Sequence, residues 1–233
     1  MEINILQLID GARAAKGLTV IIDVFRAFSL EAYLFASGVS KIIPIGDVDI
    51  AYKLKAEDPS FILAGERGGR IMEGFDLGNA PSDVSKLSVK DKTVVHTTSA
   101  GTQGIANAIY ADEILGASLV NARATAEYIL KSGAERVSLV CMGLAGVEET
   151  DEDTLCARYI KGILENETLN MTAEIESLKH TSGAKFFDKS QADVFPEEDF
   201  YLCTSVDKFD FAMRLVKSAE DNNYMERINI YES

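Results

Sequence analysis

Residues 19–29 have the sequence TVIIDVFRAFS, and this stretch is the clearest indication of the fold class. Its apolar start is typical of a buried strand, and its polar continuation from Asp23 is typical of the loop after a strand. Segments with apolar residues three and four apart separate this run from other such runs, which predicts βαβ units around a mostly parallel or mixed sheet of an α/β protein. The predicted strands are Thr19–Val24, Ile42–Ile45, Phe61–Ala64, Thr93–Thr97 and Val137–Met142.

Helix starts are indicated by residues that commonly cap helices. The predicted helices are Val48–Ala56 after Asp47, Gln103–Tyr110 after the threonine-rich loop, Ala122–Lys131 after Asn121, and a helix that begins with Thr150 and Asp153 as a capping box. No linker or repeat divides the chain, so residues 1–233 are expected to form one compact α/β unit. Two intertwined subdomains without a visible boundary are the alternative.

The composition and net charge argue against several classes of protein. The chain has no run of about 18 apolar residues and no basic, apolar leader, so neither a membrane span nor a secretory signal is expected. Three widely spaced cysteines predict a reducing, cytoplasmic location rather than a disulfide framework. A net charge of −14 disfavours nucleic-acid and membrane partners, because the field of the protein repels polyanions. The loops at the strand ends, and not the composition, predict a small anionic phosphorylated substrate as the partner, and a homodimer is left open.

An anionic substrate in so acidic a protein needs arginines or a metal ion nearby, and loops at strand ends supply candidates. In the first loop, Asp23 and Arg26 offer a metal ligand and a phosphate clamp, or else a structural ion pair. In the second, Arg67 and Arg70 suit phosphate oxygens, unless Gly68-Gly69 simply turns a hairpin and leaves both arginines in solvent.

Two further loops precede helices. Residues 97–102 place hydroxyls and Gly101 at a helix N-terminus, which is either an anion cradle or a set of helix caps. The acids at 151–153 offset a helix dipole, and Glu152 or Asp153 also suits Mg²⁺, which prefers oxygen ligands.

Other chemistries lack their motifs. His96 and His180 form no HExxH pair and no CxxC occurs, which argues against a zinc site. The absence of a GxSxG elbow argues against a serine hydrolase, and the lack of glycine between Ile22 and Gly38 argues against a dinucleotide-binding oxidoreductase. Cys141 lies in an apolar run and is expected to be a core thiol.

The loops, in this order, resemble the 2-phosphosulfolactate phosphatase family of coenzyme M biosynthesis. The resemblance covers most of the chain and depends on Asp23–Ala27, Gly65–Arg67, Gly74–Pro81, Thr97–Thr102, Leu119–Ala122 and Glu152–Leu155. Residues Phe28, Ala100, Gln103 and Arg158 depart from the family's pattern.

The resemblance implies a three-layer α/β/α fold and Mg²⁺-dependent hydrolysis of (R)-2-phospho-3-sulfolactate to (R)-3-sulfolactate and phosphate. Together with the loops, it predicts catalytic residues Asp23, Arg26, Glu66 and Asp76, substrate-binding residues Arg67, Asn79, Thr97, Thr98, Gly101, Thr102 and Asn121, and metal ligands Asp23, Glu66 and Asp153. Direct attack by water is the expected mechanism, and a covalent route through Asp or Ser is the alternative. Another phosphomonoester as substrate, or anion binding without catalysis, are the alternative functions.

Overall fold

A single sheet runs through the protein, whose computed structural model describes residues 1–219 and 222–231. The strands are β1 (Glu2–Gln7), β2 (Gly17–Ile22), β3 (Lys41–Pro44), β4 (Ile62–Arg67), β5 (Arg70–Ile71), β6 (Thr93–Thr97), β7 (Ala111–Ala117), β8 (Arg136–Cys141), β9 (Phe211–Val216) and β10 (Tyr224–Asn229). The α-helices are α1 (Leu8–Ala14), α2 (Ala27–Ala36), α3 (Val48–Glu57), α4 (Gly101–Asn107), α5 (Ala122–Ser132), α6 (Asp151–Glu165), α7 (Met171–Leu178) and α8 (Glu197–Cys203). Short 3₁₀ helices are η1 (Pro81–Lys86), η2 (Leu119–Asn121), η3 (Ala184–Phe187) and η4 (Lys189–Gln191).

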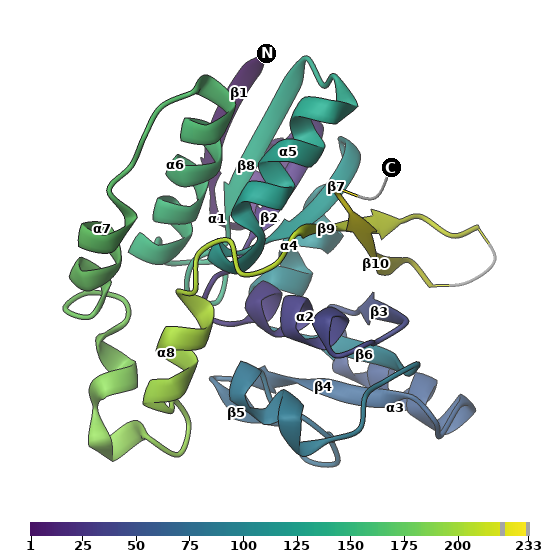
Figure 1. The fold of residues 1–233 in the computed structure, drawn as a ribbon. Helices are drawn as coiled ribbons and strands as arrows, with labels where there is room; N and C mark the ends of the chain where they lie inside the picture. Colours follow the sequence, from purple (N-terminus) through teal and green to yellow (C-terminus); the bar gives the residue numbers. More distant parts are fainter. Residues whose placement is uncertain (220–221, 232–233) are drawn as a thin grey trace.

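The sheet consists of two parallel blocks joined by an antiparallel hairpin. Its strand order is β1-β8-β2-β7-β9-β10-β3-β6-β4-β5. The strands β1, β8, β2 and β7 are parallel to one another, as are β3, β6 and β4, whereas β9 and β10 pair antiparallel with each other and with the strand on either side. In Figure 1 the first block runs steeply upward and the second runs across the view, so the sheet is strongly twisted between them.

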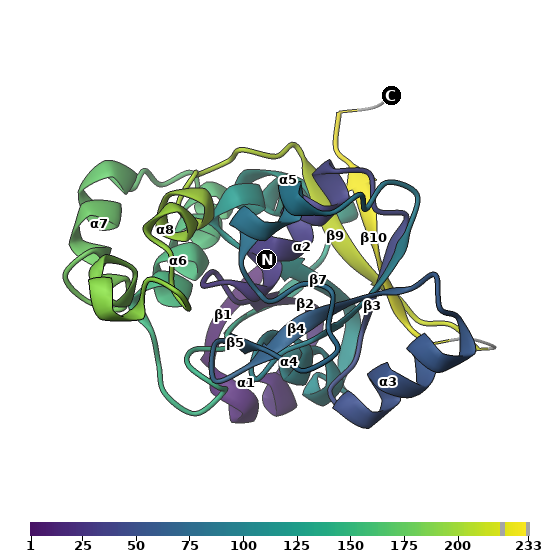
Figure 2. The same cartoon turned by 90° about the horizontal axis from the view of Figure 1, so that it is seen from below.

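Helices cover both faces of the sheet. Helices α1, α4 and α2 pack on the face that carries Ile21 and Ile42, and α5, α6 and α3 pack on the face that carries Ile22 and Ile43. The view from below shows helices on both sides of the strands (Figure 2). The core agrees with this arrangement, because alternate residues of β2 face opposite layers: Val20 and Ile22 pack with α5 and α6, and Ile21 packs with α1 and α4. None of the helices in the described part of the chain is both long and apolar enough to cross a membrane.

The predicted α/β class and mixed sheet are confirmed, and each predicted strand is present, with its ends within three residues, as β2, β3, β4, β6 and β8. The pattern did not reveal β1, β5, β7 or the β9–β10 hairpin, whose apolar residues are interrupted by polar ones. The predicted helix Gln103–Tyr110 is α4, which ends at Asn107 because residues 111–117 form β7. The capping box at Thr150 is wrong, since the Asp153 carboxylate instead bonds two loops distant in sequence.

Candidate active site

A cavity of about 660 Å³ lies where the carboxyl ends of both parallel blocks meet. Strand register aligns the ends within each block, with Ile22 of β2 opposite Cys141 of β8, and Gly65 of β4 opposite Thr97 of β6. The loops after these strands line one part of the cavity, and the start of α6 and residues 181–195 line the rest. The lining residues are Asp23, Phe25, Glu66, Gly68, Gly69, Asn79, Ser99, Ala100, Gly143, Leu144, Ala145, Glu148, Glu149, Thr150, Asp151, Glu152, Thr181, Ser182, Lys185 and Phe195.

Asp23 stands at the centre of this site. It directly follows β2, lines the cavity and is 7% exposed. Burial raises the pKa of Asp23 to about 6, and repulsion from Glu66 and Glu152 adds to the rise. The backbone N–H groups of Ala27 and Gly101 oppose it, and the Ala27 N–H donates to Asp23 Oδ1 at 3.3 Å. Asp23 is therefore a carboxyl group whose ionisation responds to any cation that enters the cavity.

Glu66 is fixed by the turn between β4 and β5. The Gly69 N–H donates to Glu66 Oε2 at 2.7 Å, and the Ser99 N–H donates to Oε1 at 2.9 Å. Gly69 has φ +81°, and a Cβ there would lie 2.7 Å from the Phe195 ring, so this turn requires glycine. The predicted hairpin at Gly68-Gly69 is thus present, and the same turn holds a cavity carboxylate.

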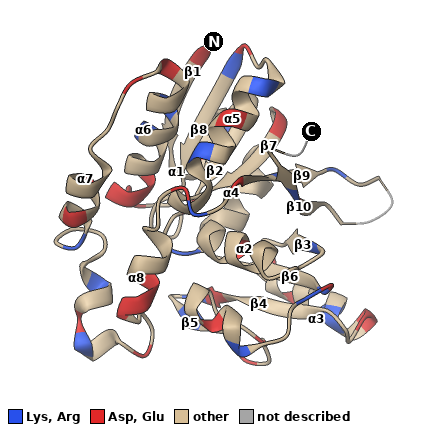
Figure 3. Cartoon of the chain, viewed as in Figure 1, with Lys and Arg blue, Asp and Glu red and all other residues tan. Residues whose placement is uncertain are grey.

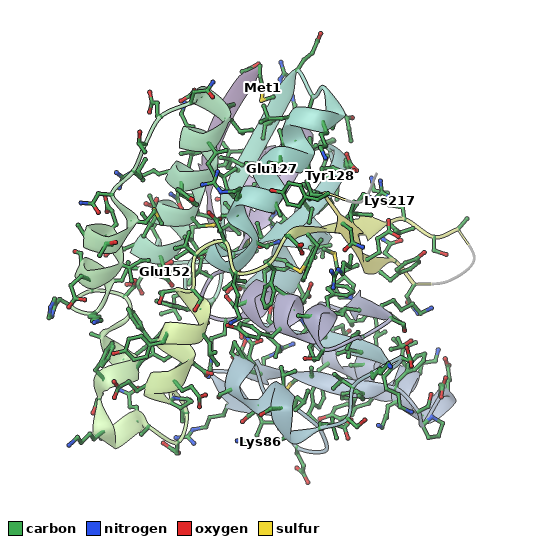
Figure 4. All side chains as sticks on the ribbon, viewed as in Figure 1. Met1, Lys86, Glu127, Tyr128, Glu152 and Lys217 are labelled. Carbon is green, nitrogen blue, oxygen red and sulfur yellow. The ribbon has the colours of Figure 1, made fainter. Side chains whose placement is uncertain are left out.

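Two acids at the start of α6 behave differently. The Val24 and Gly143 N–H groups each donate to Asp153 at 2.8 Å, so Asp153 joins the loops that follow β2 and β8. Burial and the nearby Glu152 and Asp23 carboxyls raise the pKa of Asp153 well above its ordinary value. Glu152 lines the cavity at the start of α6, where Figure 4 labels it.

Glu152 keeps one oxygen free. Its Oε2 is buried and accepts no hydrogen bond from the residues that the structure describes. Burial raises the pKa of Glu152, and Lys185 acts most strongly against the rise. The hydroxyls of Thr150 and Ser182 lie near enough to favour the ionised form, but neither makes a well-formed hydrogen bond. A buried, unpaired carboxylate oxygen facing a cavity is a candidate ligand for a cation.

Arg26 is a structural residue rather than an open phosphate clamp. Its Nη1 donates to Asp199 Oδ2 at 3.1 Å and to the Val194 carbonyl at 2.8 Å, and its Nη2 donates to the Gly69 carbonyl at 3.1 Å. The guanidinium also lies 4.9 Å from the centre of the Phe195 ring. Arg26 does not line the cavity, and the predicted alternative of a structural ion pair holds with Asp199 as partner instead of Asp23.

Asn79 lines the cavity at the end of a buried polar chain. Glu31 Oε1 lies 2.8 Å from His96 Nδ1, and His96 Nε2 lies 3.2 Å from Asn79 Oδ1. Glu31 and His96 are fully buried. With its oxygen turned to His96, Asn79 has its Nδ2 donor left, and nothing in residues 1–219 or 222–231 accepts a hydrogen bond from it.

The threonine hydroxyls of the threonine-rich loop already have hydrogen-bond partners within the protein. The Thr98 N–H donates to Thr102 Oγ1 at 3.0 Å and the Thr102 N–H donates to Thr98 Oγ1 at 3.1 Å. Thr97 Oγ1 accepts from Arg67 Nη2 at 3.1 Å. The Thr98 hydroxyl therefore accepts a hydrogen bond from an N–H group of the first turn of α4, in line with the structural alternative, whereas the Thr97 hydroxyl bonds Arg67. The residues of this loop that line the cavity are Ser99 and Ala100.

Besides Arg26, Asp153 and the predicted residues of the threonine-rich loop (Thr97, Thr98, Gly101 and Thr102), three more predicted site residues lie outside the cavity lining. Asp76 is exposed, and its Oδ2 accepts from the Leu63 N–H at 2.8 Å and from Lys55 Nζ at 3.2 Å. Arg67 does not line the cavity, and its Nη1 donates to the carbonyl of Glu66 at 2.8 Å. Asn121 is buried, and its Oδ1 accepts from the Ser118 N–H to close η2. The structure brings together Asp23, Glu66 and Asn79 from the predicted set, with Asp153 beneath them.

The sequence interpretation missed Lys185. This residue belongs to η3, in the irregular part of the chain after Thr168, and it lines the cavity together with Phe25 and Phe195. Phe186 packs edge-on against Phe25 with ring centres 4.9 Å apart, which fixes η3 beside the loop after β2. A basic residue next to two phenylalanines is the available signal, and no periodicity connects it to the strand ends.

The cavity lining has more acidic than basic side chains, so a bound cation would reduce the repulsion between the carboxylates. Acidic groups dominate the lining, and Figure 3 shows acidic residues gathered at the start of α6. No three His, Cys, Asp or Glu side chains of the described residues are grouped closely enough to hold a metal ion by themselves. Mg²⁺ commonly takes one or two carboxylates and completes its shell with water and phosphate oxygens. The free oxygen of Glu152 beside Asp23 and Glu66 fits that incomplete, oxygen-only type of site.

The fold and this cavity define an α/β enzyme with a ligand site at the carboxyl ends of parallel strands. The model of the family described as 2-phosphosulpholactate phosphatase matches residues 3–218. The chain belongs to this family, which consists of hydrolases that act on a phosphomonoester.

Relatives named "Probable 2-phosphosulfolactate phosphatase" match most of the chain. The relative from Bacillus subtilis is 34% identical over 222 residues, which cover 94% of this chain and 96% of the relative. The relative from Thermotoga petrophila is 34% identical over 210 residues, covering 84% and 88%. The relative from Caldanaerobacter subterraneus is 31% identical over 225 residues, covering 87% and 90%.

Proposed function

We propose that this protein hydrolyses (R)-2-phospho-3-sulfolactate to (R)-3-sulfolactate and phosphate, with Mg²⁺ as cofactor, in the cytoplasm as a step of coenzyme M biosynthesis. One observation supports this most: Asp23, Glu66 and Glu152 converge at the sheet edge in a member of this phosphatase family. The three cysteines are free and buried, which suits a reducing compartment.

One or two of the carboxylates of Asp23, Glu66 and Glu152 would hold the Mg²⁺ ion, together with water and substrate oxygens. When bound, Mg²⁺ supplies Lewis-acid polarisation of a phosphoryl oxygen and neutralises the charge that develops there. Asp23 is the natural centre of the set, because Glu66 and Glu152 both act on its pKa. The backbone donors to Asp23 and Glu66 hold both carboxylates in fixed orientations before substrate arrives.

The remaining residues position the substrate. Asn79 directs its amide N–H into the cavity and donates to a phosphoryl oxygen, while the Glu31–His96 pair keeps the amide from rotating. Ser99 provides a hydroxyl on the same wall. A water molecule attacks phosphorus in line with the leaving oxygen, the phosphorus–oxygen ester bond breaks, and one proton of the attacking water is passed to the alcohol oxygen of sulfolactate, while the other stays on the phosphate. Positioning and electrostatics are the main demands of phosphoryl transfer, and the site offers both.

Phosphate release is the direct test. The purified chain is expected to release phosphate from (R)-2-phospho-3-sulfolactate with Mg²⁺ and to stop when EDTA is added, with activity restored by excess Mg²⁺. Asp23→Ala should lower kcat by about 100-fold or more, since it removes a central charge of the site. Tight binding of the substrate without phosphate release would instead identify an anion-binding protein. Faster release from another phosphomonoester would reassign the substrate.

Direct attack by water is tested separately from the overall activity. Rapid quenching of the enzyme with ³²P-labelled substrate should trap no phosphorylated protein during the first turnover. A labelled Asp or Ser peptide that forms and decays at the turnover rate would establish the covalent route in its place.

A further inference from the structure

One basic side chain, Lys185, contributes to the cavity lining among the described residues. Its lining contains the acids Asp23, Glu66, Glu148, Glu149, Asp151 and Glu152. Against them, Lys185 is the one basic side chain that the described residues contribute to the lining. If the proposed function is right, the substrate carries a carboxylate and a sulfonate in addition to its phosphate. A metal ion at the carboxylates neutralises the phosphoryl group, so the other anionic groups need a cation of their own.

The ammonium of Lys185 is available for this purpose. Its Nζ lies 5.6 Å from the ring centre of Phe25, 5.6 Å from that of Phe186 and 5.4 Å from that of Phe195. It makes no hydrogen bond or ion pair with the residues that the structure describes. Aromatic faces hold a cation in place without using its N–H donors, which therefore stay free for a ligand.

The arginines nearest to the site are already engaged. Arg26 donates to Asp199 and to two carbonyl oxygens. Arg67 donates to the Glu66 carbonyl and to Thr97, and Arg70 pairs with Asp193 at 3.1 Å. None of the three lines the cavity. Recruiting any of them for substrate would break contacts that hold the loops together.

We propose that Lys185 is a specificity-determining residue that binds the non-transferred anionic group of the substrate, a sulfonate or a carboxylate. Lys185 comes from η3, whereas Asp23 and Glu66 come from strand ends, so the two parts of the substrate are recognised by different parts of the chain. The phosphoryl group lies at the strand ends and the second anion lies at the aromatic wall.

Four phosphomonoesters separate these roles: phosphosulfolactate, 2-phospholactate with a carboxylate only, the phosphate ester of 2-hydroxyethanesulfonate with a sulfonate only, and ethyl phosphate with neither. The assays use saturating Mg²⁺, so that Glu152 stays ionised without the charge of Lys185 nearby. Lys185→Met should then lower kcat/KM for phosphosulfolactate by about 100-fold, the loss of one hydrogen-bonded charge, and leave ethyl phosphate within about threefold. Lys185→Arg should recover most of the loss, because it restores the positive charge. Whichever singly charged ester shares the loss identifies the group that Lys185 binds.

The matched control is Lys189→Met, which changes an exposed lysine of the neighbouring η4 and should alter none of the four rates. Equal losses on all four esters in Lys185→Met, or no loss on any, would overturn the proposal. Binding of sulfolactate by calorimetry gives an independent readout: Lys185→Met should weaken it by about 10-fold or more, and unchanged affinity contradicts the proposal. If the wild type releases no phosphate, the proposed function fails, while this binding comparison still decides the role of Lys185.

Discussion

Arg26 and Asp199 form a buried ion pair, with Nη1 and Oδ2 3.1 Å apart and both side chains almost fully removed from solvent. Asp199 Oδ1 also accepts from the Ser82 N–H at 3.1 Å. The pair therefore connects the loop after β2, the start of η1 and helix α8. Arg26 also donates to the Val194 and Gly69 carbonyl groups, so it attaches the segment before α8 to the turn between β4 and β5 at the edge of the cavity.

Replacing Arg26 should therefore destabilise the protein as a whole. Arg26→Ala leaves Asp199 buried and unpaired, and we expect a loss of about 3–5 kcal/mol in the free energy of unfolding. Urea unfolding followed by circular dichroism measures it. Arg158→Ala is the control, since Arg158 pairs with Glu174 at the surface and should cost at most about 1 kcal/mol. Equal midpoints for the two variants would show that the buried pair does not hold the loops.

Asp153 should matter for stability as much as for activity. Asp153→Ala removes the acceptor of two backbone N–H groups at 2.8 Å and leaves the buried Val24 donor and the half-buried Gly143 donor without it, for an expected loss of about 3 kcal/mol. Thermal unfolding with and without Mg²⁺ measures the change. Asp10→Ala, at an exposed surface pair, serves as the reference and should leave the melting temperature almost unchanged. If Asp153→Ala melts at the wild-type temperature but loses activity, Asp153 acts on the chemistry alone.

Glu152→Gln should increase stability while it reduces activity. The substitution keeps the shape of the side chain and removes a buried charge whose Oε2 has no hydrogen-bond partner among the described residues. We expect a higher melting temperature at pH 8 without metal, and a kcat lowered by about 100-fold because the proposed metal ligand is weakened. Exposed Glu165→Gln is the matched control. A lower melting temperature in Glu152→Gln would show that the charge is already compensated.

The stability of the metal-free protein should depend on pH through Asp23. Its pKa is raised from 3.8 to about 6 by burial first and by Glu66 and Glu152 next. The folded protein thus binds more protons than the unfolded chain between these values, so stability falls as the pH rises from about 4 to 6 and stays low above that. The shift corresponds to about 3 kcal/mol at full ionisation.

The comparison of wild type with Asp23→Ala isolates this effect from other titrating groups. The denaturant midpoints measured at pH 4.5 and at pH 8 should differ more in the wild type than in Asp23→Ala. Adding Mg²⁺ at pH 8 should raise the wild-type midpoint there and so remove most of the difference between the two pH values. Parallel pH dependence in the two proteins would mean that Asp23 is fully ionised and compensated in the folded state.

The variant Asn79→Asp tests whether the side-chain N–H of Asn79 contacts the substrate. The exchange replaces the free N–H donor by a carboxylate oxygen in an already acidic cavity, so kcat/KM should fall by about 100-fold, chiefly through a higher KM for the anionic substrate. Asn229→Asp is the control, because its oxygen accepts from Arg227 at 2.7 Å on the surface and the charge is tolerated there. Unchanged KM in Asn79→Asp would mean that this amide does not contact the substrate.

The sequence by itself determined the α/β class, five of the strands and the loops that form much of the cavity. These follow from local rules: apolar runs form buried strands, and polar residues after parallel strands gather at one edge of the sheet. Asp23 was predicted for that reason, Glu66 and Asn79 were predicted from the family resemblance, and the three line the same cavity. The same rules do not place side chains such as Asp76 and Asn121, which accept hydrogen bonds from the backbone N–H groups of Leu63 and Ser118 and do not line the cavity.

Only the tertiary structure decided which partner each charged group takes. Arg26 pairs with Asp199 far along the chain, Asp153 bonds the loops after β2 and β8, and Lys185 reaches the cavity from a segment without periodicity. The physical reason is that hydrogen bonds and ion pairs act over a few ångströms. Their partners are therefore fixed by long-range packing, here by the aromatic contacts that seat η3 and α8 against the loop after β2.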